Sequence, residues 1–380
     1  MKLTIFANYL NHHQVLVTDC LFDALGDNFR FVTTLTSNPE QMKGGGDFSN
    51  RVYCICAADD IHKHSEALRL AVESDVCVFG ADSISFAIER AKRNPKGISF
   101  EMGERWLKRG WVNVLSPHFL KWWLSYLLFF RKANFYRLCS SAFASLDMKR
   151  LRAYKGRCYK WGYFTKVDVD FNFDEQQKHE SDTDKVLLMW CARFLKWKHP
   201  ELPIYLAKRL KDDHYKFSIR MYGSGSEFES TKQLAKFLDV DDVVVFMGNK
   251  PNSEILKAMR EHDIFLFTSD RNEGWGAVAN ESMSNGCVLV GSDEIGSVPY
   301  LVENHQNGVI FKSCNLDSLY SEVKFLLDSP KDRCKLSRNA VQIMKSIWSP
   351  ASAANNLLSL IGQLREQQQT TVLKGPCSIA

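Results

Sequence analysis

Two glutamates flank a glycine-containing turn directly after an apolar segment. Residues 264–268 read Ile-Phe-Leu-Phe-Thr, and such a run is typical of a strand covered on both faces of a parallel sheet. Glu273 and Glu281 follow it, with Gly274 and Gly276 between them. If a helix begins near Gly276, Glu273 lies in the loop before it and Glu281 in its second turn. One of the two carboxylates can then reach one end of an elongated ligand and the second carboxylate the other end, with backbone amides between them.

A ligand with hydroxyl groups at both ends and negative charge in the middle fits this pattern. A nucleotide-sugar has that composition, because a diphosphate joins a ribose to a sugar. Its diphosphate requires positive partners, and Arg193 and Lys198 follow the apolar run at 186–190. We expect both side chains at the carboxyl end of that strand, where open α/β sheets bind ligands.

Apolar runs of strand length alternate with helical patterns along both halves of the chain. The strand candidates of the N-terminal half are 3–7, 31–35, 52–56, 76–79 and 98–100, and its helical patterns include 64–74 and 83–93. The strand candidates of the C-terminal half are 186–190, 217–222, 243–247, 264–268 and 288–291, with helical patterns between them. This alternation predicts β-α-β units and parallel sheets. The predicted fold is therefore α/β, with two Rossmann-like doubly wound domains facing a central cleft.

A polar stretch separates the two halves. We predict an N-terminal domain at 1–165, a linker at 166–185 and a C-terminal domain at 186–345. A helix at 346–366 is expected to pack back on the N-terminal domain, and we expect the tail at 367–380 to be disordered.

The segment from Glu273 to Val290 resembles the two-glutamate signature of retaining glycosyltransferases of the GT-B fold, in particular glycosyltransferase family four. Further pieces of the pattern match in order: Cys191-Ala-Arg193 with Lys198, Tyr222-Gly223-Ser-Gly225, Phe246-Met-Gly248, Thr268-Ser269, Gly296 with Val298-Pro299, and Asn307-Gly308. The resemblance covers residues 186 to about 345. Three positions depart from the pattern: Ala192, Ser297 and Tyr300.

This resemblance implies a role for each matching residue. Glu281 would bind the donor ribose, Glu273 would face the transferred sugar, and Arg193 with Lys198 would stabilise the diphosphate. The remaining donor-binding positions would be Gly223, Gly225, Gly274, Trp275 and Gly276. The family is expected to need no metal or other cofactor and to retain anomeric configuration, with the departing phosphate taking the proton of the acceptor. The C-terminal domain would bind the donor and the N-terminal domain the acceptor.

Polar residues also follow strands in the N-terminal half. His12 and His13 come after the first strand, and Glu104 and Arg105 come after 98–100. They are candidates for contacting the acceptor or a donor phosphate. The alternative for His12 and His13 is a surface histidine pair, and the alternative for Glu104 and Arg105 is a structural ion pair. The segment Lys-Gly-Gly-Gly-Asp at 43–47 reads as a mobile loop.

The stretch 118–160 interleaves aromatic and basic residues, and Asp147 is its only acid. A basic amphipathic stretch is a candidate for lying at an anionic membrane, and packing in the domain core is the alternative. Membrane contact would favour an acceptor on a polyprenyl carrier. No nucleic-acid signature accompanies the basic residues.

The composition is that of an ordinary soluble protein, with 380 residues, 45% hydrophobic and 24% charged. The eleven cysteines lack paired metal-ligand spacing, so we expect reduced thiols and no metal site. The first residues lack the long apolar region of a secretory signal. The most apolar run, 122–130, has about half of the ~20 residues that a spanning helix needs. We therefore expect a cytoplasmic protein, with association to the inner face of the membrane as an addition.

The predicted function is retaining, metal-independent transfer of a sugar from a UDP- or GDP-sugar to a glycan or polyprenyl-linked glycan, in surface polysaccharide or glycolipid biosynthesis. A sugar-nucleotide epimerase on the same fold is an alternative enzyme function, whereas a phosphorylase would need a lysine setting for its cofactor that the sequence does not show. A non-catalytic nucleotide-sugar-binding or membrane scaffold is an alternative of another class.

Overall fold

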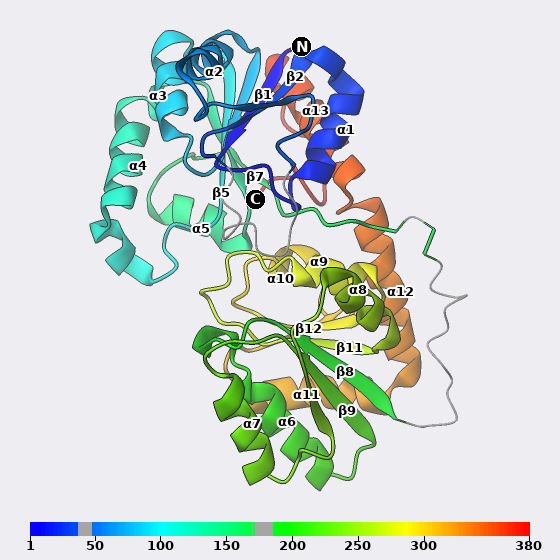
Figure 1. Ribbon diagram of the computed structural model, residues 1–380. Helices are drawn as coiled ribbons and strands as arrows, with labels where there is room; N and C mark the ends of the chain where they lie inside the picture. Colours follow the sequence, from blue (N-terminus) through cyan, green and yellow to red (C-terminus); the bar gives the residue numbers. More distant parts are fainter. Residues whose placement is uncertain (37–47, 169, 172–184) are drawn as a thin grey trace. The chain divides into compact units, whose positions relative to one another are not determined.

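The computed structural model describes residues 1–36, 48–168, 170–171 and 185–380. It divides into two compact units, one of residues 1–166 with 347–380 and one of residues 167–346. Figure 1 colours both along the sequence. The loop at 43–47 and most of the predicted linker, residues 169 and 172–184, lie outside the described residues.

Seven parallel strands form the sheet of the first unit, in the order β3-β2-β1-β4-β5-β6-β7. Their bounds are β1 (Leu3–Ala7), β2 (Phe29–Thr33), β3 (Cys54–Cys56), β4 (Val76–Phe79), β5 (Ile98–Gly103), β6 (Phe135–Cys139) and β7 (Cys158–Lys160). The helices of this unit are α1 (Val15–Leu25), α2 (Ile61–Glu73), α3 (Ile84–Arg93), α4 (Pro117–Leu128), α5 (Ala142–Arg150) and α13 (Pro350–Arg365). Because β1 pairs with both β2 and β4, the strand order reverses beside it and leaves a crevice at the carboxyl ends.

Six parallel strands form the sheet of the second unit, in the order β10-β9-β8-β11-β12-β13. Their bounds are β8 (Val186–Cys191), β9 (Phe217–Tyr222), β10 (Val244–Gly248), β11 (Ile264–Phe267), β12 (Val288–Ser292) and β13 (Val309–Phe311). The helices are α6 (Glu201–Asp212), α7 (Phe228–Phe237), α8 (Asn252–Glu261), α9 (Val278–Ser284), α10 (Val298–Leu301), α11 (Leu316–Asp328) and α12 (Pro330–Ser346). Here β8 pairs with both β9 and β11, so the order reverses between β8 and β11.

The two sheets confirm the predicted fold class of two Rossmann-like parallel-sheet domains. Every residue of the central strands β1, β4, β11 and β12 is buried, as expected for strands covered by helices on both faces. The strands β6, β7 and β13 were not predicted from the sequence. Two of these have only three residues, and β6 contains Arg137, which interrupts its apolar pattern.

The expectation of a disordered tail is wrong. The backbone N–H of Cys377 donates to the carbonyl of Lys160 at 2.7 Å, and Tyr159 forms an antiparallel bridge with Ile379. Cys377 is fully buried. The tail therefore covers the edge strand β7, whose backbone groups would otherwise lack partners on that side.

Candidate active site

Two loops meet at the point where the strand order of the second unit reverses. The loop after β8 carries Arg193 and Lys198, and the loop after β11 carries Glu273. These residues are far apart in the sequence, but β8 and β11 are neighbours in the sheet. Their carboxyl ends are therefore adjacent, and this is where doubly wound sheets bind ligands.

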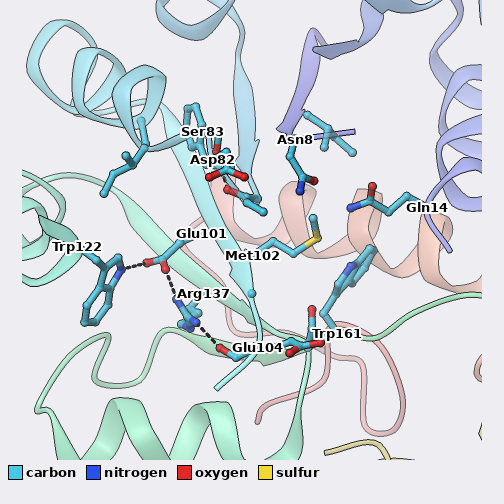
Figure 2. A pocket seen from close by; sticks show the side chains of 18 of the residues that line it. Asn8, Gln14, Asp82, Ser83, Glu101, Met102, Glu104, Trp122, Arg137 and Trp161 are labelled. Carbon is cyan, nitrogen blue, oxygen red and sulfur yellow. Dashed lines mark hydrogen bonds and ion pairs between the residues drawn. The ribbon is translucent and has the colours of Figure 1, made fainter. Parts of the chain in front are cut away.

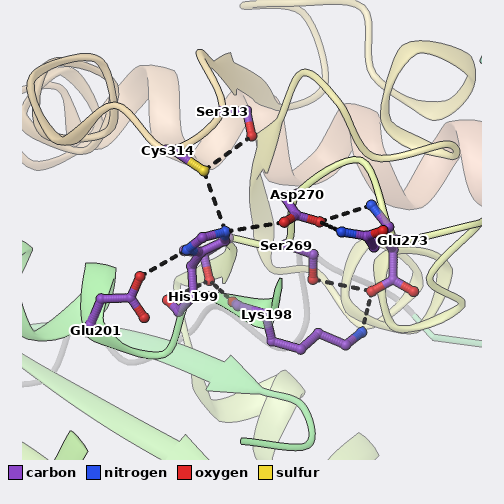
Figure 3. Close-up of polar contacts among 10 residues, drawn as sticks. Lys198, His199, Glu201, Ser269, Asp270, Glu273, Ser313 and Cys314 are labelled. Carbon is purple, nitrogen blue, oxygen red and sulfur yellow. Dashed lines mark hydrogen bonds and ion pairs between the residues drawn. The ribbon is translucent and has the colours of Figure 1, made fainter. Parts of the chain in front are cut away.

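An ion pair joins the two loops. The Nζ of Lys198 contacts Oε2 of Glu273, and the Oγ of Ser269 donates to the same oxygen at 3.1 Å (Figure 3). Glu273 is 8% exposed. The ammonium also lies 4.2 Å from the centroid of the Trp197 ring. Both partners are thus held in one geometry, because each has a second contact beside the ion pair.

Further hydrogen bonds, from side chains and from the backbone, hold the same loops together. Thr268 accepts from Nε1 of Trp190 at 2.9 Å and donates to the carbonyl of Lys198 at 2.7 Å. The N–H of Asp270 donates to the carbonyl of Trp197 at 3.0 Å. The positions of Lys198 and Glu273 are therefore set by the strand ends as well as by their own contact.

His199 adds a side-chain clamp that the sequence analysis missed. Its Nδ1 lies 2.8 Å from Glu201, its Nε2 lies 3.4 Å from Asp270, and Nε2 is also 3.3 Å from Sγ of Cys314 (Figure 3). The hydrogen bond with Glu201 is the largest cause of a raised pKa for His199, and burial opposes it. The only signal in the sequence was Glu201 two positions away, since Asp270 and Cys314 are distant in the chain.

Glycines allow the neighbouring loops to approach closely. Gly223 has φ +126, and a Cβ there would lie 2.0 Å from the carbonyl oxygen of Ala192. Gly225 has φ +154, and a Cβ there would lie 2.3 Å from the carbonyl oxygen of Phe194. The loop after β9 thus lies directly against the loop that carries Arg193, and a side chain at either glycine would separate them.

The Gly-Trp-Gly turn is folded inward. Trp275 is 1% exposed, and its Nε1 donates to the side chain of Asn280 at 2.8 Å. Its side chain is therefore part of the interior. Only the backbone of Trp275 is left for the predicted contact with the donor. Gly274 is buried beside it, and Gly276 has φ +81, with a Cβ there 2.3 Å from the ring of Phe267.

Glu281 lies in the first turn of α9, because the helix begins at Val278. The expectation of a helix start near Gly276, with Glu281 in the second turn, is off by two residues. Burial raises the pKa of Glu281 to about 7, and a contact from Nδ2 of Asn252 at 3.4 Å opposes the rise. A carboxyl group in such a site gains from hydrogen-bond donors such as sugar hydroxyl groups.

Arg193 is exposed and makes no side-chain hydrogen bond or ion pair with the residues that the structure describes. It therefore offers an uncompensated positive charge on the same loop as Lys198. In the described part of the chain, no group of three or more His, Cys, Asp or Glu side chains could hold a metal ion.

The first unit contains a cavity of about 730 Å³ at the carboxyl ends of β1, β4 and β5. His13, Glu104 and Arg105 line it, whereas His12 is not among the lining residues. Glu104 accepts from Tyr163 at 2.6 Å and pairs with Lys108.

The two residues expected as a candidate pair, Glu104 and Arg105, have separate partners. Arg105 lies 3.4 Å from Asp147, whose side chain is fully buried. Arg105 therefore forms an ion pair with Asp147 and not with Glu104, so the structural pair of Glu104 with Arg105 is absent from the described residues.

The cavity also contains charged residues that the sequence analysis missed. Arg137 donates to Glu101, and Glu101 also accepts from Trp122 at 2.8 Å (Figure 2). Glu101 accepts a third hydrogen bond from Tyr154 at 2.6 Å. Both lie within strands, where a charged residue in an otherwise apolar run was the only signal in the sequence.

Residues 171–342 match the family model described as "Glycosyl transferases group 1". An uncharacterized glycosyltransferase of Haemophilus influenzae is 29% identical over 33% of this chain and 34% of its own length. A D-inositol 3-phosphate glycosyltransferase of Corynebacterium efficiens is 24% identical over 47% of this chain and 42% of its own length. The chain thus matches less than half the length of these curated relatives.

Solved structures match over almost the whole chain. The Anabaena protein HepE in complex with UDP has a TM-score of 0.68 at 13% identity, covering 97% of this chain and 99% of that one. The lipopolysaccharide outer core galactosyltransferase WaaB has a TM-score of 0.70 at 12% identity, covering 95% of this chain and 99% of that one. At these identities the likeness shows the fold, which is GT-B.

Proposed function

We propose that this protein, whose residues 171–342 match the family model described as "Glycosyl transferases group 1", transfers a sugar from a nucleotide-sugar to a glycan or lipid-linked glycan, with retention of configuration and without a metal ion. The observation that carries the proposal is the ion pair of Lys198 with Glu273 where the strand order of the second unit reverses, with Arg193 on the same loop as Lys198.

The donor spans the two loops of that site. Glu281 accepts hydrogen bonds from the ribose hydroxyl groups, Arg193 and Lys198 bind the diphosphate, and Glu273 faces hydroxyl groups of the transferred sugar. The solved neighbour that contains UDP supports a uridine nucleotide. Since Lys198 already contacts Glu273, one ammonium group can contact both the sugar-binding carboxylate and the phosphate.

In this scheme, catalysis depends on the positive charges of Arg193 and Lys198. Negative charge develops on the diphosphate as the bond to the anomeric carbon breaks, and Arg193 and Lys198 stabilise that charge. The departing phosphate oxygen takes the proton of the acceptor hydroxyl group, which attacks from the same face. This arrangement retains configuration and requires neither a protein base nor a divalent ion.

Helix α4 supports contact with a membrane. Phe119, Trp122 and Tyr126 face the core of the first unit, whereas Leu120 and Leu124 are 47% and 55% exposed. Further exposed residues beside them are Trp111, Val112, Leu115, Leu127, Leu128, Lys121, Arg131 and Lys132. An apolar surface with basic residues beside it suits an anionic bilayer, which would bring a polyprenyl-linked acceptor within reach. No helix in the described ranges has the length and apolar character needed to cross a bilayer.

Binding to vesicles tests the membrane contact. Cosedimentation with phosphatidylglycerol vesicles is expected for the wild-type protein and is expected to fall when Leu120 and Leu124 are both replaced by Gln. The same pair of replacements should leave binding of the nucleotide unchanged. Equal sedimentation of the two proteins would remove the membrane contact from the proposal.

Nucleotide binding and turnover test the transfer reaction. The protein is screened by thermal shift against UDP-, GDP-, ADP- and CMP-sugars with and without EDTA, because a ligand that binds the native state raises the melting temperature. We expect a shift with one series, unchanged by EDTA and reduced in Glu281→Ala. Transfer to an acceptor is then followed by nucleotide release. Conversion of the bound nucleotide-sugar without an acceptor would indicate an epimerase, and binding without any turnover would favour a scaffold.

A further inference from the structure

A thiol, an imidazole and a carboxylate follow one another at hydrogen-bond distances in the second unit. Sγ of Cys314 lies 3.3 Å from Nε2 of His199, and Nδ1 of the same ring lies 2.8 Å from Glu201 (Figure 3). A second carboxylate, that of Asp270, lies 3.4 Å from Nε2. A nucleophile, a base and a group that orients the base stand in this order where proteins activate a thiol.

The packing of two helices brings these residues together. His199 and Glu201 lie at the start of α6, and Cys314 lies in the turn between β13 and α11. Arg209 of α6 pairs with Asp317 of α11, so the two helices lie side by side. The segments before them are therefore neighbours, and the thiol meets the imidazole although the two residues are 115 positions apart in the chain.

The turn that carries the thiol is anchored on both sides. The backbone N–H of Ser313 donates to Asp293 at 2.8 Å, and Asn315 accepts from the backbone N–H of Ser318 at 2.8 Å. Cys314, between these anchors, is exposed. A reagent in solution can therefore approach the sulfur while the sulfur stays within reach of the imidazole.

The hydrogen-bonding capacity of each group places the protons. A carboxylate only accepts, so Nδ1 of His199 donates to Glu201, and Nε2 of the neutral ring carries a lone pair that faces the thiol. Burial raises the pKa of the Cys314 thiol, and three nearby carboxylates raise it further: those of Asp270, Glu294 and Glu201. The hydrogen bond with Glu201 is the largest cause of the raised pKa of His199. The proton therefore rests on the sulfur, beside an imidazole that is more basic than usual.

We infer that Cys314 is a modification site, where the disulfide of a low-molecular-weight thiol is captured as a mixed disulfide with His199 as the base. The proton of Sγ moves to Nε2, and Asp270 accepts a hydrogen bond from the imidazolium that forms. The Cys314 sulfur attacks one sulfur of the reagent, so that a new S–S bond forms and the S–S bond of the reagent breaks. The departing thiolate takes the proton from Nε2. Cys314 is thereby oxidised, half of the reagent is reduced to a free thiol, and the site does not depend on the proposed transfer reaction.

Comparison of two exposed cysteines tests the inference. The reduced full chain is treated with bis(2-hydroxyethyl) disulfide, an uncharged probe, and each cysteine is followed by peptide mass spectrometry. Cys334 is the internal control, because it is exposed and makes no side-chain hydrogen bond with the residues that the structure describes. We expect Cys314 to react about tenfold faster than Cys334. A thiol of raised pKa without a base reacts more slowly than an ordinary exposed thiol, so equal or slower modification of Cys314 overturns the inference.

A variant without the imidazole assigns the effect to the base. His199→Gln keeps a polar side chain and removes the group that takes the proton. The rate at Cys314 should fall about tenfold, and the rate at Cys334 in the same sample should stay unchanged. An unchanged rate at Cys314 in this variant, with native folding verified by circular dichroism, overturns the role of His199.

The pH dependence of the wild-type rates gives a test that needs no variant. The rate at Cys314 should rise with pH through the pKa of His199 and then level off, because only the neutral ring can take the proton. The rate at Cys334 should keep rising with the fraction of thiolate. Parallel pH profiles of the two cysteines would show that the contact of Cys314 with His199 is structural only, and would overturn the inference.

Discussion

Replacing Lys198 by Met should both destabilise the second unit and slow sugar transfer. The side chains of Lys198 and Glu273 are 12% and 11% exposed, so the loss of the ammonium leaves a largely buried carboxylate without its cation. Breaking a buried ion pair costs about 3–5 kcal/mol. Ser269 still donates to the carboxylate, and the pair is not fully buried, so we expect a loss of about 2–3 kcal/mol.

A second replacement separates the charge effect from simple loss of packing. In Lys198→Met with Glu273→Gln, no unpaired charge is left, so most of the lost stability should return. Urea denaturation followed by tryptophan fluorescence measures both variants, provided that the slope with denaturant is unchanged. A loss below about 0.5 kcal/mol for Lys198→Met, or a double variant no more stable than the single one, would refute the ion-pair reasoning.

Activity gives an independent readout of the same residue. If Lys198 stabilises the departing diphosphate, both the single and the double variant should transfer sugar about 10²–10³ times more slowly, the usual cost of removing one such group. Stability and activity would then respond differently, because only stability is recovered in the double variant. Wild-type turnover in Lys198→Met would remove Lys198 from the catalytic scheme.

Three further predictions concern the second unit. Burial raises the folded pKa of Glu281 to about 7. The native state therefore holds this proton more tightly than the unfolded chain does. The stability that the protonated carboxyl group contributes is lost as the pH rises from about 4.5 to about 7. Glu281→Gln should therefore stabilise the protein by the order of 1 kcal/mol at pH 8 and leave it unchanged near pH 4, measured by urea denaturation at both values. Gly223→Ala should cost about 2–3 kcal/mol, since the new Cβ would lie 2.0 Å from the carbonyl oxygen of Ala192 at positive φ; an equal melting temperature would contradict this contact. His199 has a pKa that is raised chiefly by its hydrogen bond with Glu201, so its contribution is present below pH 6.5 and lost as the pH rises through the folded pKa. The melting temperature of the wild type should therefore exceed that of His199→Gln more at pH 5.5 than at pH 8.5, and a constant difference would refute a charged clamp with Glu201 and Asp270.

The sequence was sufficient to predict the fold class. Parallel strands are buried on both faces, so they leave continuous apolar runs, and residues 264–267 form β11 with every residue buried. Short strands were not predictable in the same way. β7 and β13 have three residues each, which is too few to establish a pattern.

The sequence also identified residues of the candidate site, because glycines and charged side chains directly after an apolar run have few structural roles. Which of them touch could not be read from the chain. Lys198 meets Glu273 because β8 and β11 are neighbours in the sheet, and strand order depends on how whole β-α-β units pack. Trp275 was grouped with the donor-binding residues, yet its side chain lies in the interior.

The cavity of the first unit was the least predictable feature. Glu101 and Arg137 lie on neighbouring strands and neutralise each other, and Gln14 reaches the same cavity from the loop after β1. The type of each residue specifies its hydrogen-bonding capacity and its charge. The sequence alone determined these two properties. Whether a polar atom is partnered or left open toward a cavity depends on distances of a few ångströms between segments far apart in the chain, and only the tertiary structure decides that.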